Sequence, residues 1–205
     1  METQVKKPIF LCDVDGVIAD FIGAALITAS HVTGELYSRD QVDRWDMYKA
    51  IGLNEQDEKE SYALLQKEGF CSGLRVLPGA ESAVKILQKM TNLWFVTSPL
   101  PHSPTWAAER EEWLYKHFNV DRAKVIHTHD KSLIAGEILL DDRVKNLVDW
   151  TAPDGNRVPI LWNTYWNEKE SWDGSRFQTW EQVFQLIEDF SRNLTGVPSH
   201  KHSSK

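Results

Sequence analysis

The sequence lacks the features of a membrane-bound or disulfide-stabilised protein. It has only two cysteines in 205 residues, too few for a disulfide framework. No apolar run approaches the length of a membrane-spanning helix, and residues 1–7 are too polar to begin a secretory signal. We therefore expect a cytoplasmic protein that does not associate with a membrane.

Basic residues are also in the minority. The chain has 23 Lys and Arg against 30 Asp and Glu, a formal net charge of -7, and no basic stripe. Because duplex nucleic acid is bound by neutralising its phosphates, we expect no such partner, although a small phosphorylated molecule can still bind locally. The absence of a glycine-rich phosphate loop argues against an ATP-using kinase.

The composition that remains is that of a globular protein. The apolar fraction is 41% and the charged fraction 26%, and the length fits one domain with a small insertion. Nine tryptophans are many for this length. Large aromatic rings build cores, and they also line pockets for small molecules.

Short apolar runs alternate with helical patterns through most of the chain. Alternation of this kind predicts an α/β fold with a mostly parallel sheet covered by helices on both faces. The helix at 104–118 would begin with Ser103 as its N-cap, and the one at 179–190 with a capping box. The expected strands are 9–12, 93–97, 125–128, 138–140 and 159–162, and the expected helices are 80–90, 104–118 and 179–190.

Residues 19–77 break this alternation. They contain no good strand, and the patterns at 21–32 and 55–68 are helical, with a short aromatic stretch at 40–50 between them. We expect a small helical cap, residues 19–77, inserted after the first strand of an α/β core. That core would comprise residues 1–18 and 78–192, followed by a disordered polar tail at 193–205.

Polar side chains follow four of the expected strands directly. The carboxyl ends of parallel strands share one edge of a sheet, where α/β proteins bind ligands. Adjacent acids repel each other unless a cation or a proton intervenes, and clustered carboxylates suit Mg²⁺. The four strings are Asp13-Val14-Asp15-Gly16, Thr97-Ser98-Pro99, Asp130-Lys131 and Asp141-Asp142-Arg143.

Simpler interpretations exist for each string alone. The first could be a solvated acidic turn, but it is not an EF-hand loop, because its glycine comes too early. The pair Asp141-Asp142 alone suits a helix N-terminus. His127 and His129 alternate along a strand and could ligate a metal, but no further ligands accompany them. The combination of all four strings favours phosphoryl-transfer chemistry, in which carboxylates, hydroxyls and an ammonium each have a use.

In this order, the strings resemble the four motifs of the haloacid dehalogenase (HAD) superfamily. Within it, the closest resemblance is to the 5′(3′)-deoxyribonucleotidases, and it spans residues 8–190. The resemblance implies a HAD-like, Rossmann-type core with a small helical cap. It also implies Mg²⁺ as cofactor and a small phosphorylated substrate, and it leaves a homodimer open.

The resemblance further implies catalytic and metal-binding roles. Asp13 would be the nucleophile and a Mg²⁺ ligand, and Asp15 the general acid/base, with its backbone carbonyl on the metal. Asp142 would be the other side-chain ligand, supported by Asp141.

The remaining roles concern the substrate. Thr97 and Ser98 would bind its phosphate, and Lys131 would neutralise charge on it. Three aromatic residues would line the substrate pocket, with a looser correspondence than the motifs: Phe21, Trp45 and Phe70.

These roles predict a Mg²⁺-dependent phosphomonoesterase of nucleoside monophosphates, particularly deoxyribonucleotides, that works through an aspartyl-phosphate. One alternative is a phosphatase of a sugar phosphate or another metabolite, because residues 100–104 lack the basic residue that these nucleotidases carry there. The other is a non-catalytic binding module, which would be expected to lose at least one of Asp13, Asp15, Lys131 and Asp142.

Overall fold

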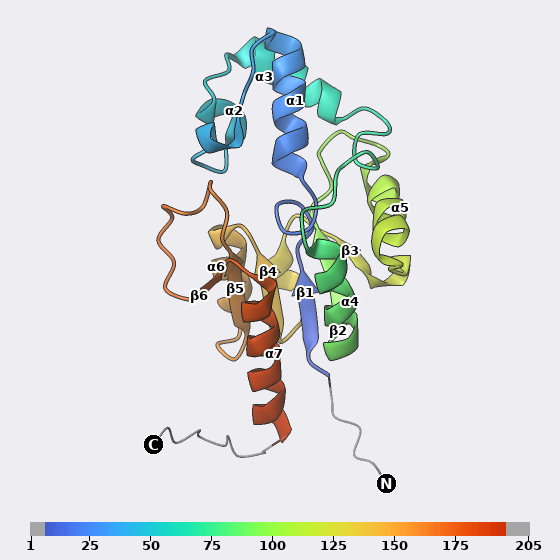
Figure 1. The fold of residues 1–205 in the computed structure, drawn as a ribbon, viewed down its shortest axis with the longest axis vertical. Helices are drawn as coiled ribbons and strands as arrows, with labels where there is room; N and C mark the ends of the chain where they lie inside the picture. The colour runs from blue at the N-terminus through green and yellow to red at the C-terminus, as the bar shows by residue number, and fades with distance from the viewer. Residues whose placement is uncertain (1–6, 196–205) are drawn as a thin grey trace.

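The computed structural model describes residues 7–195, and one parallel sheet forms its centre (Figure 1). Within these residues the sheet has six strands in the order β3-β2-β1-β4-β5-β6, and every neighbouring pair is parallel. This confirms the predicted α/β class. The strands are β1 (Ile9–Cys12), β2 (Asn92–Thr97), β3 (Val125–His127), β4 (Ile138–Asp141), β5 (Val158–Trp162) and β6 (Ser175–Phe177).

Strand β6 has no counterpart in the sequence prediction. It is three residues long, Ser175–Phe177, and pairs with β5 at the edge of the sheet. Its residues are only half-buried, so they need no apolar run. A strand this short has no periodicity to detect, and pairing with its neighbour is what makes it a strand.

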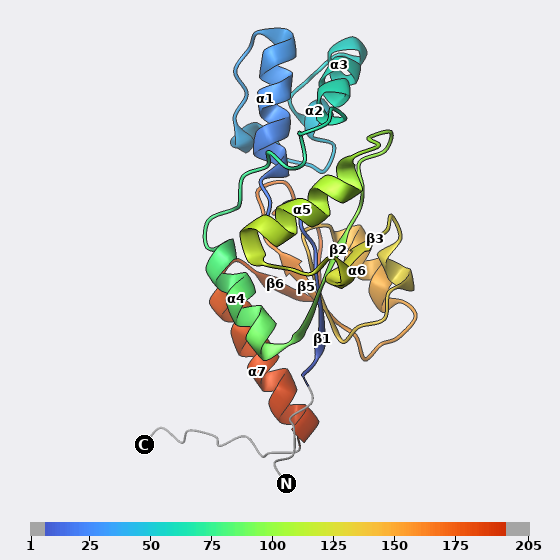
Figure 2. The ribbon, with the colours of Figure 1, turned by 90° about the vertical axis from the view of Figure 1, so that its right-hand side faces the viewer.

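Helices cover both faces of the sheet (Figure 2). Alternate strand residues point to opposite sides, so Phe10 packs in one hydrophobic cluster and Leu11 in the other. The first cluster lies beneath α4 (Ala80–Met90), α5 (Trp106–Phe118) and α7 (Trp180–Thr195), and the second beneath α6 (Val144–Thr151).

The start of α5 and the end of α7 differ from those predicted. Helix α5 begins at Trp106 with Thr105 as its N-cap, two residues after the predicted start. Helix α7 continues to Thr195, about five residues beyond its predicted end, so the predicted tail begins inside this helix. Residues 196–205 of that tail lie outside the described residues. No helix in the part of the chain that the structure describes is long and apolar enough to cross a membrane.

Residues 21–65 form a layer of helices above the carboxyl edge of the sheet (Figures 1 and 2). They have a hydrophobic cluster of their own, which includes Leu26, Tyr48 and Leu65. The predicted helix at 55–68 ends earlier, and the aromatic stretch becomes two short helices. The elements are α1 (Phe21–Thr33), η1 (Arg39–Gln41), α2 (Met47–Ala50) and α3 (Glu55–Leu65).

The chain enters and leaves this layer through two paired segments. Asp20 N–H donates to the carbonyl of Arg75, and Leu77 N–H donates to that of Ile18. The Asp20 side chain also caps α1 by accepting a hydrogen bond from Gly23 N–H. The helical layer therefore stands directly over the turn that follows β1.

Candidate active site

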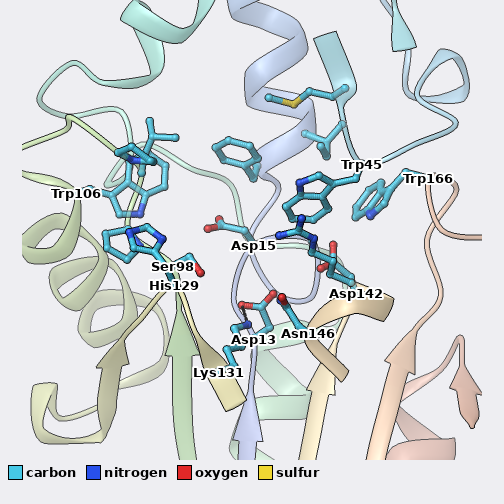
Figure 3. A pocket seen from close by; sticks show the side chains of 18 of the residues that line it. Asp13, Asp15, Trp45, Ser98, Trp106, His129, Lys131, Asp142, Asn146 and Trp166 are labelled. Carbon is cyan, nitrogen blue, oxygen red and sulfur yellow. Dashed lines mark ion pairs between the residues drawn. The ribbon is translucent and has the colours of Figure 1, made fainter. Parts of the chain in front are cut away.

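The predicted acids meet between β1 and β4. Strands β2 and β3 lie on one side of β1 and strands β4 to β6 on the other, so this is the topological switch point of the sheet. Asp13 follows β1, Asp141 ends β4, and Asp13 N–H donates to the carbonyl of Leu140 at 2.9 Å. This is the position at which open α/β sheets bind ligands. Figure 3 shows Asp13, Asp142 and Lys131 converging there.

Lys131 lies buried between two of these carboxylates. Its Nζ is 2.8 Å from Asp13 Oδ1 and 2.6 Å from Asp141 Oδ2. Asp141 also accepts hydrogen bonds from Arg143 N–H and from the amide of Asn146, so both of its oxygens are engaged. Burial opposes the charge on Lys131, but the two carboxylates outweigh it and raise the pKa of this lysine.

Burial and mutual repulsion raise the pKa of two acids of the cluster. Burial raises the pKa of Asp13 to about 7, against the opposing effect of Lys131 and with a further contribution from Asp141. Burial, followed by the charges of Asp13 and Asp141, raises the pKa of Asp142 well above its usual value. One ammonium therefore does not balance the buried carboxylates.

The clustered carboxylate oxygens are suitable ligands for a hard cation. Asp13, Asp141 and Asp142 each offer a carboxylate oxygen, and these oxygens lie within 4.8 Å of one another. Asp142 Oδ1 is buried and has no hydrogen-bond partner among the described residues. An unpartnered buried carboxylate oxygen beside other acids is stabilised by a divalent cation such as Mg²⁺.

Gly16 makes the turn that brings these groups together. Its φ is +81°, and a Cβ there would lie 2.1 Å from Asp142 Oδ2 and 2.8 Å from Trp166 Cζ2. The turn is closed by hydrogen bonds such as Gly16 N–H to the carbonyl of Ala19 at 2.9 Å. Glycine is needed both for the backbone conformation and for the close approach.

Asp15 points away from Asp13 toward helix α5. Its Oδ1 is 2.6 Å from Nη2 of Arg110, whose side chain is fully buried. The sequence prediction missed Arg110. A signal was present, because Arg110 shares a helix face with Trp106 and Trp113 at spacings of four and three residues, and a cation on an apolar face needs a partner.

The predicted phosphate ligands end β2, the neighbour of β1. Thr97 is buried, and its hydroxyl has no hydrogen-bond partner among the described residues. The hydroxyl of Ser98 donates to the carbonyl of Thr128 at 2.9 Å and lines the cavity above the sheet. Ser98 therefore shares the cavity with Asp13 and Asp142, whereas Thr97 ends the strand next to β1 and is not among the residues that line the cavity.

A cavity of about 430 Å³ opens between the sheet edge and the helical layer. Its floor is polar, and its upper wall is largely aromatic (Figure 3). Phe21 and Trp45 line it as predicted, whereas Phe70 stacks on Trp106, which itself lines the cavity. Lining residues that the sequence prediction did not include are Ile22, Met47, Tyr62, Pro99, Leu100, Pro101, Trp106, His129, Arg143, Asn146 and Trp166.

The two histidines that alternate in sequence separate in space. His127 Nε2 lies 3.3 Å from Glu111 Oε1, while His129 lines the cavity near Ser98 (Figure 3). Neither belongs to the acidic cluster that could hold a metal ion in the described part of the chain.

Solved structures identify the fold as that of the HAD hydrolases. A haloacid dehalogenase-like hydrolase from Burkholderia xenovorans LB400 superimposes with a TM-score of 0.59 at 14% identity, covering 90% of this chain and 98% of that one. A Bacillus subtilis HAD hydrolase, whose structure is described as bound to magnesium, gives a TM-score of 0.55 at 14% identity, covering 89% and 99%.

Sequence comparison identifies the family within that fold. Residues 7–194 match the model of the family described as 5′ nucleotidase, deoxy (pyrimidine), cytosolic type C protein, and the chain belongs to this family. The predicted resemblance is therefore confirmed.

Three relatives illustrate the range of similarity. The mouse mitochondrial 5′(3′)-deoxyribonucleotidase is 30% identical over 139 residues, covering 65% of this chain and 63% of that protein. The human cytosolic-type enzyme is 29% identical over 143 residues, covering 65% and 69%. The Bacillus subtilis (strain 168) 5′(3′)-deoxyribonucleotidase is 24% identical over 178 residues, covering 86% and 96%.

Proposed function

We propose that this protein is a Mg²⁺-dependent phosphomonoesterase that hydrolyses nucleoside monophosphates, particularly deoxyribonucleotides, through an aspartyl-phosphate on Asp13. The observation that carries the proposal is the buried Asp13 carboxylate, held by Lys131 at the floor of the cavity with a second carboxyl two residues away. A non-catalytic module would be expected to lose at least one of Asp13, Asp15, Lys131 and Asp142, but all four are retained and line one cavity.

Asp13 suits the role of nucleophile. The hydrogen bond from Lys131 orients one carboxylate oxygen, and the other is left to attack phosphorus. Lys131 is fixed by Asp141 on its far side, so its charge stays beside the phosphoryl group as negative charge shifts during transfer. The hydroxyls of Thr97 and Ser98 complete the phosphate site.

Asp15 suits the role of general acid and base. It lines the same cavity but is turned away from the Asp13–Lys131 pair, so the two carboxyls have different surroundings. In the first step it gives a proton to the leaving oxygen, and in the second it takes one from the water that hydrolyses the acyl phosphate.

The side chains of Asp13 and Asp142, together with the backbone carbonyl of Asp15, would hold the Mg²⁺ ion. When bound, the ion supplies positive charge to the oxygens of the phosphoryl group. Asp141, whose two oxygens already accept hydrogen bonds, supports this arrangement by fixing Lys131.

The aromatic residues in the upper wall of the cavity favour a nucleoside as the leaving group. Aromatic side chains from the helical layer and from the core face the cavity, including Phe21, Trp45 and Trp106. Such rings stack on nucleobases. The names of the relatives, which are 5′(3′)-deoxyribonucleotidases, point to the same class of substrate.

A phosphate-release screen with Mg²⁺ tests the substrate. It compares deoxyribonucleoside and ribonucleoside monophosphates with several sugar phosphates, and we expect the highest kcat/KM for a deoxyribonucleotide. A clear preference for a sugar phosphate would overturn the substrate assignment and leave the chemistry standing.

The substitution Asp13→Asn tests the mechanism. Because an amide is a far poorer nucleophile than a carboxylate, we expect kcat to fall by on the order of 10⁴-fold or more, with the melting temperature showing that the variant folds. Near-normal hydrolysis by this variant would exclude the covalent route.

A further inference from the structure

The ion pair between Arg110 and Asp15 is not explained by its contribution to stability alone. The Arg110 side chain is fully buried, and its Nε and Nη1 have no hydrogen-bond partner among the described residues. Burying a guanidinium costs free energy that a single ion pair does not fully return, and an apolar side chain of similar volume often serves stability as well. The charge at this position therefore points to a role beyond packing.

Rigid neighbours hold the guanidinium in place. Its Cζ lies 5.4 Å from the ring centroids of both Trp106 and Trp113, which attract the cation. Trp113 is fixed by a 2.7 Å hydrogen bond from its Nε1 to the carbonyl of Leu74, and Trp106 is stacked against Phe70. Arg110 thus has little freedom to follow Asp15 if that carboxyl turns.

The held carboxyl still faces the substrate cavity. Asp15 Oδ1 accepts the hydrogen bond from Arg110, whereas Oδ2 accepts none from the described residues, and Asp15 lines the cavity. Oδ1 can accept this bond whether the carboxyl is ionised or protonated, because the carbonyl oxygen of a carboxylic acid is also an acceptor. The bond can therefore persist through a cycle of proton transfer.

We propose that Arg110 is a positioning residue that fixes the Asp15 carboxyl so that Oδ2 exchanges protons with the leaving oxygen and with water. This inference rests on the proposed function. In the first step an Asp13 oxygen bonds to phosphorus, the bond from phosphorus to the leaving oxygen breaks, and the proton on Asp15 Oδ2 passes to that oxygen. In the second, Asp15 takes a proton from water, whose oxygen bonds to phosphorus and releases the Asp13 carboxylate and inorganic phosphate.

Substrates with different leaving groups distinguish this positioning role from a structural one, because only the positioning role makes the effect of an Arg110 substitution depend on the leaving group. The leaving oxygen of thymidine 5′-monophosphate needs a proton, whereas p-nitrophenolate departs without one. For Arg110→Met we expect kcat/KM to fall on the order of 10²-fold for thymidine 5′-monophosphate and by less than about threefold for p-nitrophenyl phosphate. Arg110→Lys should recover part of the first loss. Arg122→Met, at an exposed arginine, is the matched control and should change neither value.

Equal losses for the two substrates would overturn the inference, because a distorted site slows both reactions. The inference would also be overturned if adding Arg110→Met to Asp15→Asn lowered kcat/KM by the same factor as it does in the wild type. A residue that acts through Asp15 has no effect once that carboxyl is gone. If Arg110→Met does not fold, the ratio of the two losses in Arg110→Lys decides by the same criterion. Failure of the wild-type protein to hydrolyse either substrate with Mg²⁺ would instead overturn the proposed function.

Discussion

Asp142 is the residue on which the proposal of a bound cation mainly rests. It is almost fully buried, its Oδ1 has no partner among the described residues, and its backbone carbonyl accepts a 2.7 Å hydrogen bond from the Asn167 amide. The backbone bond fixes the residue, while the side chain is left with the negative charges of Asp13 and Asp141 around it. A buried carboxylate oxygen without a partner, close to two other acids, is suited to the proposed Mg²⁺ site.

Asp142→Asn should therefore separate stability from cation binding. Without Mg²⁺ we expect the variant to melt at the same temperature as the wild type or higher, because a buried like charge is removed. Excess MgCl₂ should raise the melting temperature of the wild type by binding its native state, and should have little effect on the variant. Thermal melts of both proteins with and without MgCl₂ measure this, and an equal shift in the two would contradict the assignment of Asp142 as a ligand.

At the scale of an element, the turn after β1 shows how local backbone geometry serves the site. Residues Gly16 and Gly52 both have positive φ, +81° and +77°, but their surroundings differ. A Cβ on Gly16 would overlap Asp142, whereas a Cβ on Gly52 would have nothing within 4 Å. The two glycines thus separate the cost of the backbone conformation from the cost of steric overlap.

We expect Gly52→Ala to lower the free energy of unfolding by about 1–2 kcal/mol, the cost of a left-handed alanine, and to leave turnover unchanged. Gly16→Ala should cost more and should also abolish activity, because Asp142 must move to make room. Urea unfolding and phosphate release measure the two effects. Wild-type turnover in Gly16→Ala would mean that the position of Asp142 is not critical.

Helix α5 joins two parts of the site through consecutive residues. The Glu109 carboxylate accepts hydrogen bonds from the backbone N–H groups of Gly69 and Ser72, in the segment that returns from the helical layer, and Arg110 holds Asp15. Although burial opposes ionisation, hydrogen bonds that include these two lower the pKa of Glu109. One turn of this helix therefore fixes both the segment that returns from the helical layer and the Asp15 carboxyl, the proposed general acid and base.

At the scale of the whole molecule, the loop between β5 and β6 connects the core with the helical layer. Trp166 lies in this loop, yet it packs in the hydrophobic cluster of the layer with Leu26 and Tyr48, and it also lines the cavity. The loop is anchored to the core by Asn167, whose amide donates to the carbonyls of Asp142 and Trp162. The loop between β5 and β6 thus contributes a residue to the packing of the layer over the cavity.

Trp166→Ala should destabilise the protein by about 3 kcal/mol, as expected for removal of a buried indole. Because the layer would lose one of its contacts with the loop between β5 and β6, we also expect a higher KM for nucleotides and faster proteolysis within residues 21–65. Trp172→Ala, in the same loop but outside that cluster, serves as the control. Unchanged KM and protease resistance in Trp166→Ala would show that other contacts position the layer.

The sequence by itself determined the central strands and the polar residues that follow them. The runs around β1 and β4 are buried on both faces, so their apolar residues are continuous, and the acids follow where each run stops. This local pattern is enough to place Asp13 and Asp141 at one sheet edge, because the ends of parallel strands must coincide. The helical insertion was predictable for the same reason, from its lack of strand patterns.

Only the tertiary structure decided which residues distant in sequence lie near the carboxyl edge of the sheet. Arg110 reaches Asp15 across 95 positions of sequence, and Trp166 joins a hydrophobic cluster formed by residues more than 100 positions earlier. Strand β6 likewise exists only through pairing with β5. Periodicity reports whether a residue is buried but not what it is buried against, since that partner is set by the order of strands and the path of loops. The acid pair after β1 was therefore evident in the sequence, and the arginine that pairs with its second member was not.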